Sequence, residues 1–276
     1  MRHFITGAGS GIGAAIATAL EARGDELVLL ARTKERAGEL AAAFPGASLV
    51  VGDLSQPLAL EGMLAVALLP LALDSLLHIA GIARLDRVSS LSVGDARDQL
   101  NVNLLSPMVL TNALLPALRA RHGHVVFANS SAGIHAKPGW AAYSSSKFGL
   151  RGFADSLRAE EKGYGIRVSS LYLGRTATPM QRQVHAQEGW DYDPSRWMQP
   201  ETVADSVVQL LNLPRDADVP ALWIRPPAPV TDHAYDAEPG AYAPTPRSAA
   251  DVDGRTNGNV NGLTTREVTR DGRSRP

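Results

Sequence analysis

Short apolar runs alternate along this chain with longer stretches whose apolar residues recur at helical spacing. Seven runs suit β-strands, at residues 2–6, 26–30, 48–51, 75–79, 124–129, 167–172 and 221–225. Six stretches between them suit helices, at residues 12–22, 34–44, 58–69, 93–118, 142–162 and 202–211. Strands that alternate with helices form a mostly parallel sheet with helices on both faces. We therefore expect a doubly wound α/β fold.

The chain has 276 residues, and its composition changes sharply near residue 226. Residues 1–226 carry the strand and helix patterns and suit one α/β domain. Residues 227–276 are rich in Pro, Gly, Thr, Asp, Asn and Arg and have almost no apolar periodicity. Such a segment buries too little surface to offset the entropy of ordering it. We expect a disordered tail, either a non-functional extension or a segment that binds a partner.

Charge and cysteine content exclude several classes of function. The formal net charge is -1, which provides no electrostatic basis for binding nucleic acid or an acidic membrane. Without cysteines there are no disulfides, thiolate metal sites or cysteine nucleophiles, and we expect no metal. No signal peptide precedes the first strand, and no apolar stretch approaches the ~18 residues of a membrane span. We expect a soluble, cytoplasmic protein.

A glycine-rich loop, TGAGSGIG, joins the first strand to the first helix. Glycines let a backbone approach a pyrophosphate closely, and the helix N-terminus supplies N–H groups and a positive dipole end. Ile12 stands where the strict dinucleotide fingerprint has its last glycine, so a mere tight turn is the alternative. The strand–loop–helix context favours nucleotide binding and a Rossmann-type fold. The candidate cofactor-binding residues here are Thr6, Gly7, Gly9, Ser10, Gly11, Ile12 and Gly13.

The end of the second strand bears on the choice between NAD and NADP. An acidic residue there binds the adenine ribose 2′-hydroxyl, whereas an arginine suits a 2′-phosphate. Here Ala31 carries no carboxylate, and Arg32 follows it. An arginine can pair with a phosphate through two hydrogen bonds. Unless Arg32 is an ordinary loop residue, it favours NADP(H).

Tyr143 and Lys147 are four residues apart in a stretch of helical pattern, so both side chains share one face. A nearby ammonium favours the phenolate and makes the phenol a usable acid or base near neutral pH. A solvent-exposed amphipathic pair is the alternative. Ser130 follows a buried strand at the end where open α/β sheets bind ligands, and a short loop separates it from Tyr143. Asn103 lies inside a long helical stretch, where it needs a polar partner or holds a water.

Together these segments resemble the short-chain dehydrogenase/reductase family over about residues 2–226. The matching pieces are residues 6–13, Asp53 with Leu54, Ala80 with Gly81, Asn103 and its neighbours, Ser130, Tyr143 with Lys147, Gly174 and Thr178. The resemblance implies hydride transfer between NADP(H) and a carbonyl or alcohol substrate. It also implies a homodimer or homotetramer that involves the long helices.

The resemblance assigns roles to individual positions. Tyr143 would be the general acid or base, and Lys147 would bind the nicotinamide ribose and lower the tyrosine pKa. Ser130 would donate to the substrate oxygen, and Asn103 would hold a water that continues a proton relay. Asp53 would accept from the adenine amine beside Leu54, unless it is simply a turn residue; Ala80, Gly81, Gly174 and Thr178 would also contact the cofactor.

The sequence departs from the family pattern at two places. His78 and Ile79 replace the asparagines that brace the central strands, and Leu173 replaces a proline. Residues 178–200 fall where this family has a variable substrate lid; the lid's large side chains either line an apolar substrate or pack the lid onto the domain. These are Met180, Trp190, Tyr192 and Trp197.

Two other functions stay open. The first is an NADP-binding regulator or scaffold of the same fold without turnover. The second is an epimerase or dehydratase that uses the same cofactor and tyrosine, although the short segment after Thr178 argues against it.

Overall fold

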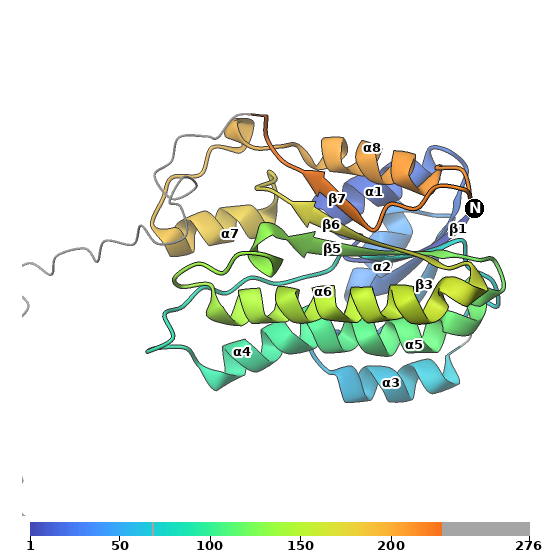
Figure 1. The fold of residues 1–276 in the computed structure, drawn as a ribbon, viewed down its shortest axis with the longest axis horizontal. Helices are drawn as coiled ribbons and strands as arrows, with labels where there is room; N and C mark the ends of the chain where they lie inside the picture. Colours follow the sequence, from blue (N-terminus) through green and yellow to red (C-terminus); the bar gives the residue numbers. More distant parts are fainter. Residues whose placement is uncertain (68, 228–276) are drawn as a thin grey trace, which may run out of the picture. The chain divides into compact units, whose positions relative to one another are not determined.

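A computed structural model describes residues 1–67 and 69–227, all of which belong to one compact unit. Their strands form a seven-stranded parallel sheet in the order β3-β2-β1-β4-β5-β6-β7 (Figure 1). The strands are β1 (Arg2–Thr6), β2 (Glu26–Ala31), β3 (Ser48–Val51), β4 (Ser75–His78), β5 (His124–Ser130), β6 (Arg167–Leu173) and β7 (Ala221–Ile224). The predicted doubly wound fold is confirmed.

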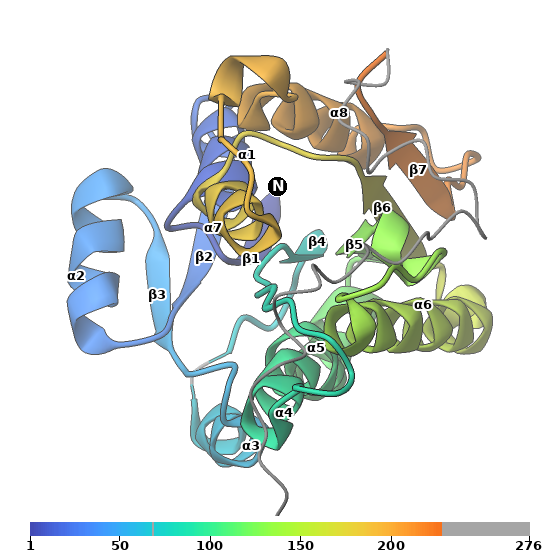
Figure 2. The same cartoon turned by 90° about the vertical axis from the view of Figure 1, so that its left-hand side faces the viewer.

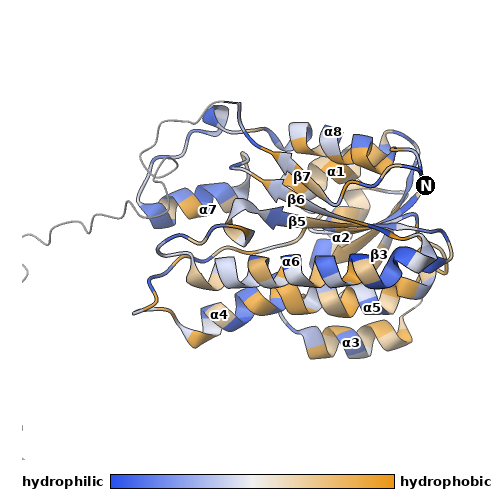
Figure 3. Cartoon of the chain, in the orientation of Figure 1, coloured by the Kyte–Doolittle hydropathy of each residue, from blue (hydrophilic) through white to orange (hydrophobic). Residues whose placement is uncertain are grey.

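Helices cover both faces of this sheet (Figure 2). They are α1 (Gly11–Glu21), α2 (Lys34–Ala43), α3 (Pro57–Val66), α4 (Val93–Leu100), α5 (Ser106–Arg119), α6 (Ala141–Glu161), α7 (Pro179–Glu188) and α8 (Pro200–Leu211). Successive strand residues point to opposite faces. Phe4 of β1 therefore packs into a core with α3, α5 and α6, whereas Ile5 packs into a second core with α1, α2 and α8. Hydrophobic and hydrophilic residues alternate along α5, α6 and α8 (Figure 3), and the buried hydrophobic residues of these helices belong to the two cores.

The chain reverses its winding direction between β1 and β4. From β1 it runs outward through β2 to β3, then returns to β4 beside β1 and continues through β5, β6 and β7. Ligands of open α/β sheets bind outside the carboxyl ends of the strands at such a switch point. The glycine loop after β1 and residues 79–82 after β4 meet there.

Two elements differ from the sequence prediction. The helix expected at residues 93–118 is divided into α4 and α5 by a π-helical turn, Asn101–Leu105, which periodicity alone does not reveal. Helix α7 was not predicted, although its end signals are present. Thr178 caps its start by accepting from the Gln181 N–H, Pro179 is its first residue, and Gly189 ends it in the left-handed region at φ 75°.

Only the first residue of the predicted tail, residue 227, is among the described residues. The predicted boundary at residue 226 and the predicted disorder of residues 227–276 therefore stay predictions. Within residues 1–67 and 69–227, no helix has the length and apolar character to cross a membrane.

Candidate active site

The glycine loop makes a close turn between β1 and α1 that side chains would obstruct. Gly7 has a φ of +78°, and a Cβ there would lie 2.8 Å from the Ala80 nitrogen. A Cβ on Gly13 would overlap the Gly7 carbonyl. Ser10 precedes the first turn of α1 and makes no capping hydrogen bond with its side chain. The loop thus brings the backbone and the N-terminus of α1 to the switch point, as a phosphate site requires.

A cleft of about 610 Å³ opens beside this loop. Eight residues expected to bind the cofactor line it: Gly7, Gly9, Ser10, Arg32, Asp53, Leu54, Ala80 and Gly81. Leu30, Leu40 and Val102 add apolar walls, and the cleft also holds Arg36 and Arg84. Glycine backbone, apolar surface and arginines are the surroundings that an adenine nucleotide needs. The residues that line the cleft therefore fit a dinucleotide.

Arg36 is a cleft residue that the sequence analysis missed. It lies in the first turn of α2, four residues after Arg32, and its Nη2 donates to the Gly9 carbonyl at 3.4 Å. It also pairs with Glu39. The sequence did contain a signal for Arg36. Thr33 caps α2 and fixes its start, and Arg36 therefore lies in the first turn, four residues after Arg32. Two arginines thus stand where the sequence predicted one.

Tyr143 and Ser130 meet at the carboxyl end of β5. Tyr143 lies in the first turn of α6 and is 8% exposed. Burial raises the pKa of its phenol, and a hydrogen bond with the Ser130 side chain partly offsets this rise. The Ser130 hydroxyl also accepts from the Ala132 N–H at 3.2 Å. The predicted proximity of hydroxyl and phenol is therefore present in the structure.

Lys147 bonds to the backbone of β5 and lies near the Tyr143 ring. Its Nζ donates to the Ala128 carbonyl at 2.8 Å and lies 5.8 Å from the centre of the Tyr143 ring. Burial lowers the pKa of Lys147 to about 8. The Tyr143 pKa is raised, which is opposite in direction to the expected effect of a neighbouring ammonium. In this arrangement the ammonium binds the backbone of β5 and leaves the phenol to the Ser130 hydroxyl.

Asn103 bonds to protein groups through both ends of its amide. Its Oδ1 accepts from the Ile82 N–H at 2.9 Å, and its Nδ2 donates to the Ile82 carbonyl at 2.9 Å and to Ser146 Oγ at 3.0 Å. The π-helical turn directs this side chain toward Gly81, where a Cβ would lie 3.2 Å from Asn103 Oδ1 and 3.7 Å from Lys147 Nζ. Asn103 and Lys147 therefore converge on Gly81. The local partner expected for a buried asparagine is the Ile82 backbone.

Other groups take over the bracing that the missing asparagines provide in the family pattern. Thr6 Oγ1 accepts from the Ile79 and Ala80 N–H groups, both at 3.1 Å, and so ties the end of β1 to the end of β4. His78 bonds through Nε2 to Thr111 Oγ1 at 2.9 Å and stacks on Phe127. Thr6 therefore has a structural contact, and its expected contact with the cofactor stays a prediction.

The lid residues divide into two groups. Met180 and Val184 of α7 pack against Tyr143 together with Trp140. The other aromatic side chains surround His185 on the same helix: Trp190, Tyr192 and Trp197. This answers the question left open by the sequence, because Met180 lines the site and the other three pack within the lid.

The remaining candidates lie around the cleft. Thr178 approaches the glycine loop, since a Cβ on Gly11 would be 3.0 Å from its methyl group. Ile12 packs against the core on the α1 face. Gly174 follows β6, and its N–H donates to the Ile224 carbonyl at 2.9 Å. Asp53 accepts from the Ser55 N–H at 2.9 Å, which is the turn role considered as its alternative.

Comparison with known proteins is consistent with this geometry. Residues 3–189 match the model of the short chain dehydrogenase family. The chain belongs to the short-chain dehydrogenase/reductase family. An uncharacterized short-chain type dehydrogenase/reductase of Sinorhizobium fredii is 32% identical over 235 residues, which cover 83% of this chain and 93% of that protein.

Two solved structures share the fold. An alcohol dehydrogenase from the archaeon Thermococcus sibiricus, complexed with 5-hydroxy-NADP, has a TM-score of 0.70 at 25% identity, covering 81% of this chain and 95% of its own. A closed form of serine dehydrogenase complexed with NADP+ has a TM-score of 0.72 at 25% identity, covering 82% of this chain and 95% of its own. As a short-chain dehydrogenase/reductase, this chain is an NAD(P)-dependent oxidoreductase that acts on a small molecule.

Proposed function

We propose that this reductase transfers hydride between NADP(H) and a carbonyl or secondary alcohol, with Tyr143 as the general acid and base. The observation that carries the proposal is the buried Tyr143 phenol, hydrogen-bonded to Ser130 beside Lys147 and Asn103. A buried acid with one polar neighbour can pass its proton to a substrate oxygen that replaces that neighbour. The proposed assembly as a homodimer or homotetramer and the cytoplasmic location stay predictions.

Each side chain has a proposed task. The bound nicotinamide supplies or accepts the hydride. Tyr143 gives its proton to the carbonyl oxygen during reduction and takes it back during oxidation, while Ser130 donates to the same oxygen. Lys147 would hold the nicotinamide ribose, because the Ala128 carbonyl uses one of the three N–H donors of its ammonium. Asn103 orients Ile82 next to Gly81 and completes the proton path.

The cleft supports a preference for NADP(H). The glycine loop and the start of α1 would hold the pyrophosphate, and Asp53 and Leu54, which line the same cleft, would flank the adenine. Arg32 and Arg36 would bind the 2′-phosphate, because both line the cleft beside Ala31, which provides no carboxylate. The two structural neighbours described above were solved with NADP or its 5-hydroxy derivative.

The surroundings of Tyr143 support a substrate with an apolar substituent next to its carbonyl. Ala83, Ala132, Val184, Trp140 and Met180 pack around the ring. Burying an apolar group against such surfaces is favourable by about 25 cal/mol for each Å² removed from water. A charged substituent would lose its hydration there without a partner among these side chains.

Replacing Arg32 by Ala tests the cofactor preference. We expect about 10- to 100-fold weaker NADPH binding, because a hydrogen bond to a charged group contributes roughly 1.5–3 kcal/mol. NADH binding should change less than twofold, since NADH lacks the 2′-phosphate. Arg121→Ala, in the turn before β5 and far from the cleft along the sheet, is the matched control. Tighter binding of NADH than NADPH by the wild type would contradict the preference.

The activity itself is tested by the absorbance of NADPH in the presence of ketones, aldehydes and secondary alcohols. Apolar aryl and alkyl ketones should be turned over faster than ketones that carry a carboxylate. A protein that binds NADPH tightly but turns over none of these compounds would favour the regulatory alternative. Inversion of a stereocentre without net loss of NADPH would favour the epimerase alternative.

A further inference from the structure

Side-chain amides hold the segment that joins β4 to α4. They bond to its backbone N–H and C=O groups, as a neighbouring strand does in a sheet. Asn103 pairs with both backbone groups of Ile82, each at 2.9 Å. Gln99 of α4 pairs in the same way with Arg84, accepting from its N–H at 3.0 Å and donating to its carbonyl at 3.1 Å. Both amides are buried, with Gln99 at 0% and Asn103 at 1% exposure. Residues 82 and 84 are therefore fixed to the helix beside them.

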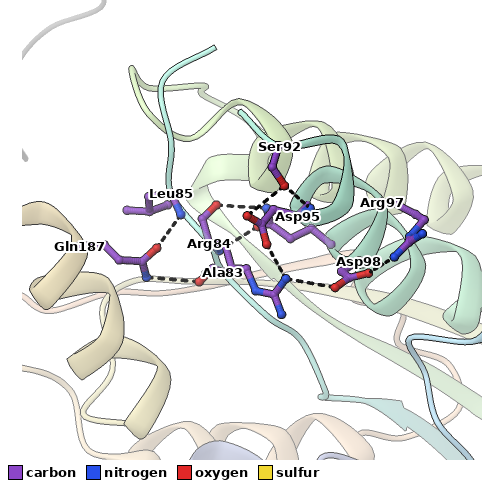
Figure 4. Close-up of polar contacts among 9 residues, drawn as sticks. Ala83, Arg84, Leu85, Ser92, Asp95, Arg97, Asp98 and Gln187 are labelled. Carbon is purple, nitrogen blue, oxygen red and sulfur yellow. Dashed lines mark hydrogen bonds and ion pairs between the residues drawn. The ribbon is translucent and has the colours of Figure 1, made fainter. Parts of the chain in front are cut away.

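The opposite edge of the same segment is bound by Gln187 of α7 (Figure 4). Gln187 Oε1 accepts from the Leu85 N–H at 2.7 Å, and its Nε2 makes a longer contact, 3.4 Å, with the Ala83 carbonyl. The backbone groups of residues 82 and 84 thus point to one side of the segment, and those of residues 83 and 85 point to the other. This alternation is the pattern of an extended strand. Residues 82–85 thus behave as a one-strand strap between α4 and α7.

The two edges of this strap differ in strength. The edge toward α4 has buried amides, and Arg84 adds ion pairs with Asp95 at 2.5 Å and Asp98 at 3.1 Å (Figure 4). Gln187 instead lies on the exposed side of α7. An exposed hydrogen bond contributes little net free energy and can open without burying an unpaired group. The strap therefore stays with α4, and the Gln187 contact is the one that can open.

Helix α7 spans the site from the glycine loop to this strap. Thr178 at its start lies against Gly11, and Met180 approaches Gly81, whose Cβ position is 3.9 Å from the methionine Cε. Val184 packs in the cluster around Tyr143. Glu188, the last residue of α7, pairs through both carboxylate oxygens with Arg175 in the connection after β6, and His185 bonds to Gln181 within the helix. Gln187 is the residue near the far end of α7 that bonds to the backbone of the strap.

We propose that Gln187 is a positioning residue, a latch that holds the far end of α7 over the cleft and so slows release of the bound dinucleotide. The inference rests on the proposed function. Residues 174–178 and the Arg175–Glu188 pair join α7 to the end of β6, so opening the latch separates α7 from the strap while that attachment persists. Met180 and Val184 would then leave Gly81 and Tyr143 together.

The test compares Gln187→Met with Gln183→Met, the same change on the exposed side of the same helix one turn earlier. Amide hydrogen exchange of the full chain measures how often the hydrogen bond between Gln187 and Leu85 opens. Stopped-flow kinetics measures the rate of NADPH release, which the latch is proposed to slow. In Gln187→Met we expect exchange of the Leu85 N–H and release of NADPH each to accelerate about 3- to 10-fold. The Ile82 and Arg84 N–H groups, which Asn103 and Gln99 hold, should exchange as in the wild type. Gln187→Glu keeps the acceptor for Leu85 and should restore most of its protection.

Each outcome decides the proposal. Unchanged exchange at Leu85 would show that no latch exists, and faster exchange with unchanged NADPH release would show a contact that does not hold the lid. Equal effects in Gln183→Met would assign the change to the helix in general. If NADPH does not bind at all, the exchange data still report the latch, and the proposed function alone fails.

Discussion

Tyr143→Phe should lower kcat/KM for NADPH-dependent carbonyl reduction by about three orders of magnitude. General acid catalysis contributes typically 10² to 10⁴ in rate, and this substitution removes the proton while keeping the ring. The Phe ring still packs against Trp140, Met180 and Val184, so we expect the fold and NADPH binding to persist. Ser130 loses its partner but keeps the Ala132 N–H. The measurement is steady-state kinetics with the best ketone of the substrate screen, accompanied by NADPH titration.

Tyr164→Phe provides the matched control for this change. Its ring is half exposed and stacks under Arg119 on another part of the surface. It loses the same phenolic hydroxyl, and activity should stay within twofold of the wild type. Wild-type turnover by Tyr143→Phe would place the proton donor elsewhere and end the proposed mechanism. A loss of NADPH binding that parallels the loss of activity would instead assign Tyr143 a binding role.

Acidification from pH 7 to pH 5 should lower the free energy of unfolding by about 4 kcal/mol through two buried histidines. Burial lowers the pKa of His78 and of His124 to about 3. An unfolded histidine titrates near pH 6.5, so the unfolded chain binds more protons below that pH. The contribution of these histidines to the free energy of unfolding is therefore fully present above pH 6.5 and decreases as the pH drops toward 3. Each histidine contributes about 2 kcal/mol to the loss at pH 5.

The hydrogen bonds of His124 explain why protonation is costly. Ser169 donates its hydroxyl to the Val219 carbonyl at 2.6 Å and so accepts from His124 Nε2 at 2.8 Å. Among the described residues, the buried Nδ1 of His124 has no hydrogen-bond partner. A second proton would therefore lie on a nitrogen without an acceptor. His3 adds to the effect, because burial lowers its pKa as well.

Urea unfolding at pH 7 and pH 5 measures this loss. His124→Gln keeps a donor toward Ser169 and cannot titrate, so the difference between the two pH values should shrink by about 2 kcal/mol. His135→Gln, the same substitution at an exposed histidine, is the matched control. A wild-type difference below 1 kcal/mol would show that these histidines are not held neutral in the fold.

The fold class and family could be predicted from sequence because their signals are local or periodic. Strands buried on both faces read as continuous apolar runs, and the loop from Thr6 to Gly13 carries its own conformational requirements. The meeting of Ser130 with Tyr143 was also foreseeable, since a short connection joins their elements. Their catalytic roles stay predictions.

The features that sequence did not reveal depend on contacts between distant segments. Lys147 donates a hydrogen bond to the Ala128 carbonyl, and its four-residue spacing from Tyr143 does not predict this partner. The π-helical turn at Asn103 has no sequence pattern that distinguishes it from the α-helices on either side. Gln187 lies 102 residues from Leu85 and binds only its backbone, so no side-chain pattern links the two.

The strap of residues 82–85 implies which substitutions this chain can accept there. Asn103, Gln99 and Gln187 use the backbone N–H groups of Ile82, Arg84 and Leu85, but only the carbonyl of Ala83. Proline, which lacks an N–H, is therefore compatible with position 83 and incompatible with the other three. Because the three amides bind only backbone atoms, a side chain of the strap can be replaced without loss of these hydrogen bonds. Its own contacts then set the limit: ion pairs for Arg84, and packing around Tyr143 for Ala83 and Leu85.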